Sequence, residues 1–79
     1  MNPKFTVDML LTLSWQEVKS INTISGEYRV EITWALDRYR INVWRRVQEP
    51  EKFVRSHYAW YARTACKTAN RMLRQLEIL

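Results

Sequence analysis

The chain has few of the residues on which disulfide-rich, metal-binding or phosphate-binding domains depend. A single cysteine, Cys66, excludes an internal disulfide and a cysteine-based zinc site. A single glycine, Gly26, excludes a glycine-rich phosphate loop. No apolar run reaches the roughly 18 residues of a membrane span, and Pro3, Lys4 and Asp8 interrupt the N-terminal stretch, which makes a poor signal peptide. We therefore expect a soluble, cytoplasmic protein that does not associate with membranes.

Side chains suited to catalysis are equally scarce. A nucleophilic site needs a Ser or Cys with a His held by a third group, and here only His57 and Cys66 are available for a Cys–His pair. On one helix their spacing of nine residues would place them half a turn apart. The carboxylates form no tight cluster beyond Glu49 and Glu51, and one His with one Cys does not reach the three or four ligands of a metal site. We predict no enzyme activity, no metal and no cofactor.

The chain is rich in cationic and aromatic side chains. Its 79 residues fit one domain and include four Trp, four Tyr and two Phe. Residues 28–79 hold eleven Lys and Arg against five acidic residues, whereas residues 1–27 hold two Lys against three acidic residues. Arg outnumbers Lys nine to four, and Arg is the better fork for phosphate or carboxylate and the better stacker on aromatic rings. The net charge of +5 biases the chain toward acidic partners.

The N-terminal segment, residues 5–24, admits two interpretations. Thr6 is a suitable residue to begin a helix, and residues 14–17, Ser-Trp-Gln-Glu, have the form of a capping box. Residues 20–24 are rich in β-branched side chains and end at a Ser-Gly turn, which favours a strand. We predict one or two short helices here, with a third strand over 17–24 as the alternative.

Residues 28–43 show the clearest pattern, an alternation of apolar and polar side chains typical of a half-buried β-hairpin. A loop of even length between the strands brings both apolar sets onto one face, with residue 34 opposite 39, 32 opposite 41 and 30 opposite 43. A four-residue loop suits the sequence better than a two-residue Leu-Asp turn. The other face then pairs Arg29 with Trp44, Glu31 with Asn42, and Thr33 with Arg40.

We predict a long amphipathic helix from about Pro50 to the C-terminus. Proline suits the first helical position, and Glu49 and Glu51 suit the positive end of the helix dipole. The predicted apolar stripe contains Val54, Tyr58, Tyr61, Ala65, Ala69, Met72 and Leu76. This helix would pack on the hairpin, giving an α+β fold of N-terminal helical segment, central hairpin and C-terminal helix. Its length would leave Met72, Leu73, Leu76, Ile78 and Leu79 partly uncovered, from which we hypothesise a homodimer.

Two basic and aromatic surfaces are the candidate binding sites. The first is the polar side of the predicted helix, where helical spacing gathers Phe53, Trp60, Arg63, Lys67, Arg71 and Arg74. The second is the outer face of the hairpin, with Arg29, Arg38, Arg40, Arg46 and Trp44. Trp60 is either covered by another segment of the chain or is an exposed anchor, and the pattern leaves both open.

The order helix, hairpin, helix, with Ala65-Cys66-Lys67-Thr68-Ala69 in a basic last helix, resembles the topology of double-stranded RNA-binding domains. The chain departs from that family because no third strand is evident. It departs again where Pro50-Glu51-Lys52-Phe53 replaces the Lys-rich start of the last helix. The resemblance implies topology alone, and no family residues are carried over.

Three functions compete on these observations. The first is nucleic-acid binding, with cations on phosphates and aromatic rings stacked on bases or sugars. The alternative is a protein-interaction module or inhibitor that docks on an acidic protein surface, since Trp, Tyr and Arg are common interface anchors. Its size class is that of phage-encoded inhibitors of host machinery or defence, such as anti-CRISPR proteins. A membrane-surface helix ranks third, because the apolar stripe is already needed to cover the hairpin.

Overall fold

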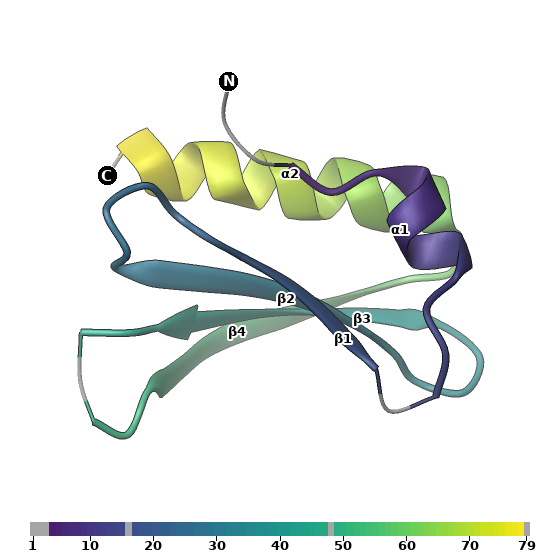
Figure 1. Cartoon of the computed structure of the whole chain (residues 1–79), viewed down its shortest axis with the longest axis horizontal. Coiled ribbons are helices and arrows are strands. Elements are labelled where there is room, and N and C mark those ends of the chain that lie inside the picture. Colours follow the sequence, from purple (N-terminus) through teal and green to yellow (C-terminus); the bar gives the residue numbers. More distant parts are fainter. Residues whose placement is uncertain (1–3, 16, 48, 79) are drawn as a thin grey trace.

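A computed structural model describes residues 4–15, 17–47 and 49–78. The elements are α1 (Val7–Leu11), β1 (Val18–Asn22), β2 (Tyr28–Trp34), β3 (Tyr39–Arg45), β4 (Lys52–Ala59) and α2 (Ala62–Ile78). The four strands form one antiparallel sheet in the order β1-β2-β3-β4, and both helices lie on the same side of it (Figure 1). The predicted α+β class is confirmed.

The predicted hairpin is present with the predicted register. Trp34 pairs with Tyr39, Ile32 with Ile41 and Val30 with Val43. The four-residue loop 35–38 keeps that parity, and within it the Ala35 N–H donates to the carbonyl of Arg38 at 2.7 Å. Leu36 adopts a φ of 66°, in the left-handed region that non-glycine residues rarely enter.

The N-terminal segment combines both interpretations. Thr6 caps α1, where its hydroxyl accepts the N–H of Met9 at 3.4 Å. The Ser14 hydroxyl donates to the Glu17 carboxylate and the Glu17 N–H donates to the Ser14 carbonyl, but no helix follows; Gln16 lies outside the described residues. Our prediction of a second helix is therefore wrong and the alternative strand is correct. A capping contact fixes one turn, whereas the open edge of β2 offers 18–22 a full ladder of hydrogen bonds.

The predicted start of the long helix at Pro50 is wrong. Residues 52–59 form β4, which pairs with β3, and α2 begins only at Ala62. Val54, Tyr58 and Tyr61, assigned to the buried stripe of the helix, are exposed. The segment is rich in aromatic and β-branched side chains, which fit a strand wherever a neighbouring edge is free. In place of a role at a helix start, Glu51 forms salt bridges with Arg29 and with Arg46.

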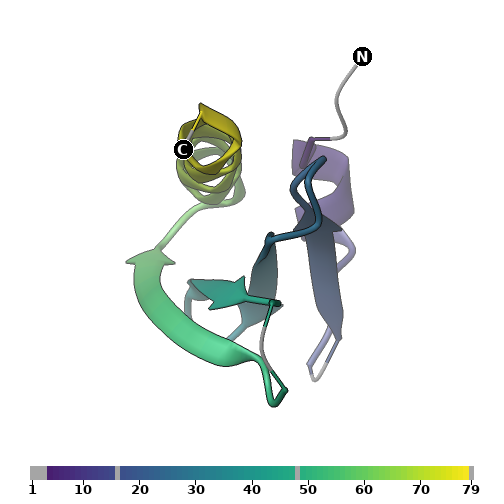
Figure 2. The same cartoon turned by 90° about the vertical axis from the view of Figure 1, so that its left-hand side faces the viewer.

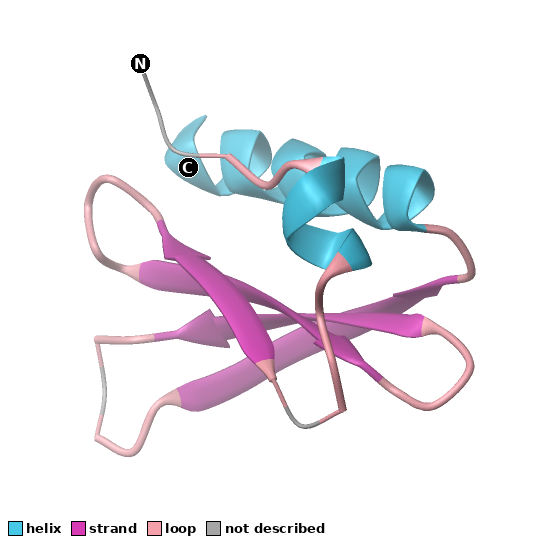
Figure 3. Cartoon of the chain, turned by 45° about the vertical axis from the view of Figure 1, so that its right-hand side comes forward, coloured by secondary structure: helices cyan, strands magenta, loops and turns pink. Residues whose placement is uncertain are grey.

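From Ala62 onward the helix prediction holds. Ala65, Ala69, Met72 and Leu76 are buried as predicted and join Val30, Ile32, Ile41 and Val43 in the core. Small residues along this face of α2 let its backbone approach the sheet closely, and α1 packs beside α2 in the same layer (Figure 3). Because α2 is shorter than predicted, Met72, Leu73 and Leu76 are covered within the chain. The argument for a homodimer then rests on Ile78 alone, since Leu79 lies outside the described residues.

The layered arrangement leaves one face of the sheet open. Seen end on, α1 and α2 occupy one side of the curved sheet, and no described segment lies as a layer on the other (Figure 2). The open face is therefore the surface on which polar and aromatic strand residues are displayed.

Within residues 4–15, 17–47 and 49–78, no helix is long and apolar enough to cross a membrane.

Candidate functional site

The open side of the sheet, called here the outer sheet face, carries alternate residues of three adjacent strands. They are Arg29, Glu31 and Thr33 of β2, Arg40, Asn42 and Trp44 of β3, and Phe53, Ser56 and Tyr58 of β4. The alternation of a β-strand places these side chains on the side opposite the core. A bulge between Val43 and Trp44 shifts the register, so that Phe53 lies directly opposite Trp44.

Glu31 organises the centre of this face. Its Oε1 accepts the indole N–H of Trp44 at 2.9 Å and the side-chain N–H of Asn42 at 3.1 Å. Arg29 lies 3.8 Å from its other oxygen, forms a 2.9 Å salt bridge with Glu51, and stands 5.7 Å from the Trp44 ring centre. These contacts fix the orientation of the indole and neutralise both carboxylates.

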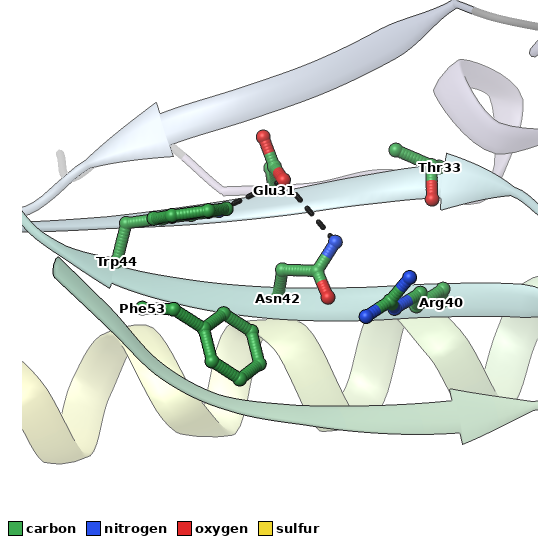
Figure 4. A pocket seen from close by; sticks show the side chains of 6 residues that line it. All are labelled: Glu31, Thr33, Arg40, Asn42, Trp44 and Phe53. Carbon is green, nitrogen blue, oxygen red and sulfur yellow. Dashed lines mark hydrogen bonds between the residues drawn. The ribbon is translucent and has the colours of Figure 1, made fainter. Parts of the chain in front are cut away.

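A shallow hollow of about 480 Å³ lies beside this network, lined by Glu31, Thr33, Arg40, Asn42, Trp44 and Phe53 (Figure 4). Asn42 is only 6% exposed, and its buried Oδ1 has no hydrogen-bond partner among the described residues. Among the described residues, no carboxylate lies within 4 Å of the Arg40 guanidinium. The hollow thus combines an unused acceptor, an unpaired cation and two aromatic walls.

A second aromatic cluster lies at the far end of β4. The Arg38 guanidinium is 4.6 Å from the ring centre of Trp60 and 5.5 Å from that of Tyr58. Asp37 holds Arg38 through a two-point contact at 3.0 and 3.2 Å, and this contact lowers the pKa of the Asp37 carboxyl group. Tyr58 is 57% exposed and Trp60 is 60% exposed. Arg38 therefore joins two rings that remain open to a ligand.

The cations of α2 form a separate surface. Arg63, Lys67, Arg71 and Arg74 share the exposed side of α2, as the helical spacing predicts. No carboxylate of the described part of the chain lies within 4 Å of any of them. These four side chains, called here the α2 stripe, point away from the sheet, so they lie on the opposite side of the molecule from the outer sheet face. The stripe contains no aromatic ring.

The structure therefore regroups the predicted site residues. Arg29, Arg40, Trp44 and Phe53 come together on the outer sheet face, whereas Arg63, Lys67, Arg71 and Arg74 stay on α2. Trp60 and Phe53 do not belong to the α2 stripe, because Trp60 lies in the loop before α2 and Phe53 lies on β4. The question left open for Trp60 is answered: it is exposed.

Two residues of the regrouped site have no role in the predicted one: Asn42 and Tyr58. Asn42 could have been found, since the predicted hairpin register already places it opposite Glu31. Tyr58 could not, because its assignment to the helix core followed from the wrong start of the helix. Arg38 was predicted on the outer face of the hairpin, but its contact with Trp60 is visible only in the structure.

The two side chains available for a Cys–His pair, His57 and Cys66, lie apart in the fold. His57 is exposed on β4, whereas Cys66 is buried on α2, where burial raises the pKa of its thiol. In the described ranges, no group of three or more His, Cys, Asp or Glu side chains is placed to hold a metal ion.

Comparisons of the chain with family models, with curated proteins and with solved structures give no significant match. The strands on either side of the hairpin also change the helix–hairpin–helix order on which the resemblance to double-stranded RNA-binding domains was based. The function must therefore be argued from the geometry of this chain.

Proposed function

We propose that this protein binds nucleic acid through the outer sheet face. The observation that carries the proposal is the exposure of three aromatic side chains next to arginines on that face and at its end. Phe53 is 44% exposed, Tyr58 57% and Trp60 60%. Exposed aromatic rings do not stabilise a face that contacts solvent alone. Patches of this kind on small soluble proteins commonly mark interaction sites.

The chemistry of these groups suits nucleic acid. Stacking of a base on an aromatic ring contributes about 1–3 kcal/mol and tolerates any sequence, because every base has a π-face. Arg38 and Arg40 lie next to Tyr58, with Arg40 6.0 Å from its ring centre. A cation at the rim of a stacking platform can pair with the phosphates that flank a stacked base, a role that we assign to Arg38.

The α2 stripe supports the proposal less directly. Four cations at helical spacing, without a salt bridge to any described residue, attract a polyanion over a distance of about a Debye length. With no aromatic ring among them, they supply charge but no platform for bases. We assign the stripe a contribution to long-range attraction and the outer sheet face the contact itself.

The same face could dock on an acidic protein surface, as the inhibitor alternative requires. Trp, Tyr and Arg are also the residues that dominate protein interfaces. Salt distinguishes the two, since neutralising several phosphates makes binding fall steeply and linearly in the logarithm of salt concentration.

The test is fluorescence anisotropy with labelled 20-nucleotide DNA and RNA, single- and double-stranded, from 50 to 300 mM salt. Wild type should bind at micromolar concentration or better. Trp60→Ala and Tyr58→Ala should each lose about 1–3 kcal/mol of binding free energy. The matched control is the pair Arg71→Gln and Arg74→Gln on the opposite side, which should reduce the salt dependence and leave the effect of the aromatic substitutions unchanged.

Failure of the folded wild-type protein to bind any of these probes at 50 mM salt would refute the proposal. A pull-down from lysate with wild type and Trp60→Ala would then test the protein-partner alternative. A stoichiometric acidic protein captured by wild type alone would support that alternative.

A further inference from the structure

We infer that the ligand is single-stranded, and that one unpaired base enters the hollow between Asn42, Arg40, Trp44 and Phe53. This inference rests on the proposed function and narrows it to one class of nucleic acid. Three features carry it: the stacking platforms, the width of the face and the unused acceptor in the hollow.

The stacking platforms require free base faces. Inside a duplex each base is covered on both sides by its neighbours, so a ring on a protein surface has nothing to stack on. The outer sheet face has two aromatic clusters, one at Phe53 and Trp44 and the other at its end, at Tyr58 and Trp60. Along β4, Phe53 and Tyr58 are five residues apart, which corresponds to roughly 17 Å. A single strand laid along β4 can present unstacked bases to both clusters.

The width of the face also disfavours a duplex. The lining of the hollow comes from β2, β3 and β4, and three adjacent strands occupy about 14 Å across at their usual spacing. The major groove of B-form DNA is about 12 Å wide and admits a helix or a two-stranded ribbon. The hollow therefore cannot reach base edges inside the major groove of B-form DNA, whereas an unpaired base can reach the hollow.

The orientation of the Asn42 amide is set by its neighbour. Its nitrogen donates to the Glu31 carboxylate at 3.1 Å, and a flipped amide would place oxygen against oxygen. Oδ1 must therefore point away from Glu31, toward the side of the hollow where Arg40 lies (Figure 4). A buried amide oxygen without a donor is costly, and no donor within the described residues satisfies it.

A base edge supplies what this site lacks. Each of the four bases has an N–H donor beside an acceptor on its Watson–Crick edge, which is free only in an unpaired base. The donor matches Asn42 Oδ1, and the acceptor matches the unpaired Arg40 guanidinium. Oδ1 is shielded from solvent in the free protein, so a neighbouring side chain must move on binding. Arg40 and Phe53 also line the hollow, and both are exposed.

The experiment compares three labelled probes of ten nucleotides at 100 mM salt: a mixed-sequence single strand, the same sequence as a duplex, and a chain of abasic units. Wild type should bind the single strand about tenfold or more tightly than the duplex. Asn42→Ala should weaken binding of the single strand about fivefold or more, and binding of the abasic chain less than twofold. Because Asn42 is buried, circular dichroism and thermal unfolding must show that the variant folds; if it does not, Arg40→Gln at an exposed position is tested in the same way.

Equal affinity for duplex and single strand would overturn the inference and leave the proposed function standing. An equal loss on the abasic chain would overturn it too, because Asn42 or Arg40 would then act without a base. If wild type binds none of the three probes, the proposed function itself fails.

Discussion

Asn70 and Phe5, 65 residues apart, are joined by two hydrogen bonds. The backbone N–H of Phe5 donates to Asn70 Oδ1 at 2.8 Å, and the Asn70 side-chain N–H donates to the Phe5 carbonyl at 2.9 Å. One amide of α2 thereby satisfies both backbone groups of a residue whose ring is buried in the core. This contact holds the N-terminal segment against the last helix.

We expect Asn70→Ala to lower the free energy of unfolding by about 1–3 kcal/mol, because two partly buried backbone groups lose their partner. Urea denaturation followed by circular dichroism measures the change. Gln75→Ala, at an exposed position of the same helix, should change it by less than about 0.5 kcal/mol. An unaltered urea midpoint for Asn70→Ala would show that the contact does not hold the segment.

We expect Leu36→Gly to stabilise the protein. Leu36 is exposed and has a φ of 66°, a conformation that costs an L-residue about 1–2 kcal/mol and costs glycine nothing in steric terms. The greater freedom of glycine in the unfolded chain offsets part of this, so the net gain should be about 0.5–1 kcal/mol. Leu36→Ala is the matched control: it removes the side chain but keeps Cβ, and should give no gain. Thermal or urea unfolding of both variants measures the change in stability.

The hairpin was predictable because its information is local. Alternation over 28–34 and 39–43 defines two apolar faces, and only an even loop brings Val30 and Val43 onto the same side. The buried stripe of α2 from Ala65 onward was predictable for the same reason, since helical spacing needs no knowledge of the partner.

The strand β4 was not predictable in this way. Val54, Tyr58 and Tyr61 recur at helical spacing, and Pro50 and Glu51 suit a helix start, so local rules agree on the wrong element. The free edge of β3 determines that this segment forms a strand, because β4 can pair with it. That edge exists only in the folded chain, so the local sequence does not reveal it. The candidate site followed the same division: Arg29 and Trp44 were placed by the hairpin, whereas Trp60 was placed only by the structure.

Stability should fall at alkaline pH. Burial raises the pKa of the Tyr39 phenol above its ordinary 10.0 and that of the Cys66 thiol above its ordinary 9.0. The unfolded chain therefore loses these protons first, and stability is fully present below about pH 9 and declines as the pH rises through the folded-state values. The decline should be at most about 1.4 kcal/mol per pH unit for each group.

Urea unfolding between pH 8 and pH 11 measures this decline, and Tyr39→Phe separates its contributions. The substitution removes one titrating group, so the slope should become shallower. It also removes the hydrogen bond from the Tyr39 hydroxyl to the Leu10 carbonyl at 3.2 Å, which should cost about 1 kcal/mol at pH 7. A slope that is unchanged in the variant would assign the decline to other groups.

Glu31 should have opposite effects on stability and on binding. Its carboxylate accepts hydrogen bonds from Trp44 and Asn42 and lies near Arg29. Hydrogen bonds to a charged group contribute about 1.5–3 kcal/mol, against about 0.5–1.5 kcal/mol for neutral pairs. Glu31→Gln should therefore lower the free energy of unfolding by about 1–2 kcal/mol.

The same substitution removes one negative charge from a face that we propose to contact phosphates, so the affinity for single-stranded DNA at 50 mM salt should stay equal or rise. Glu49→Gln changes the charge equally at an exposed position and should leave stability within about 0.5 kcal/mol of wild type. Urea unfolding and anisotropy on both variants separate the two effects. Loss of affinity in a Glu31→Gln protein that remains folded would mean that the orientation of Asn42 and Trp44 by the carboxylate matters more for binding than the negative charge it adds.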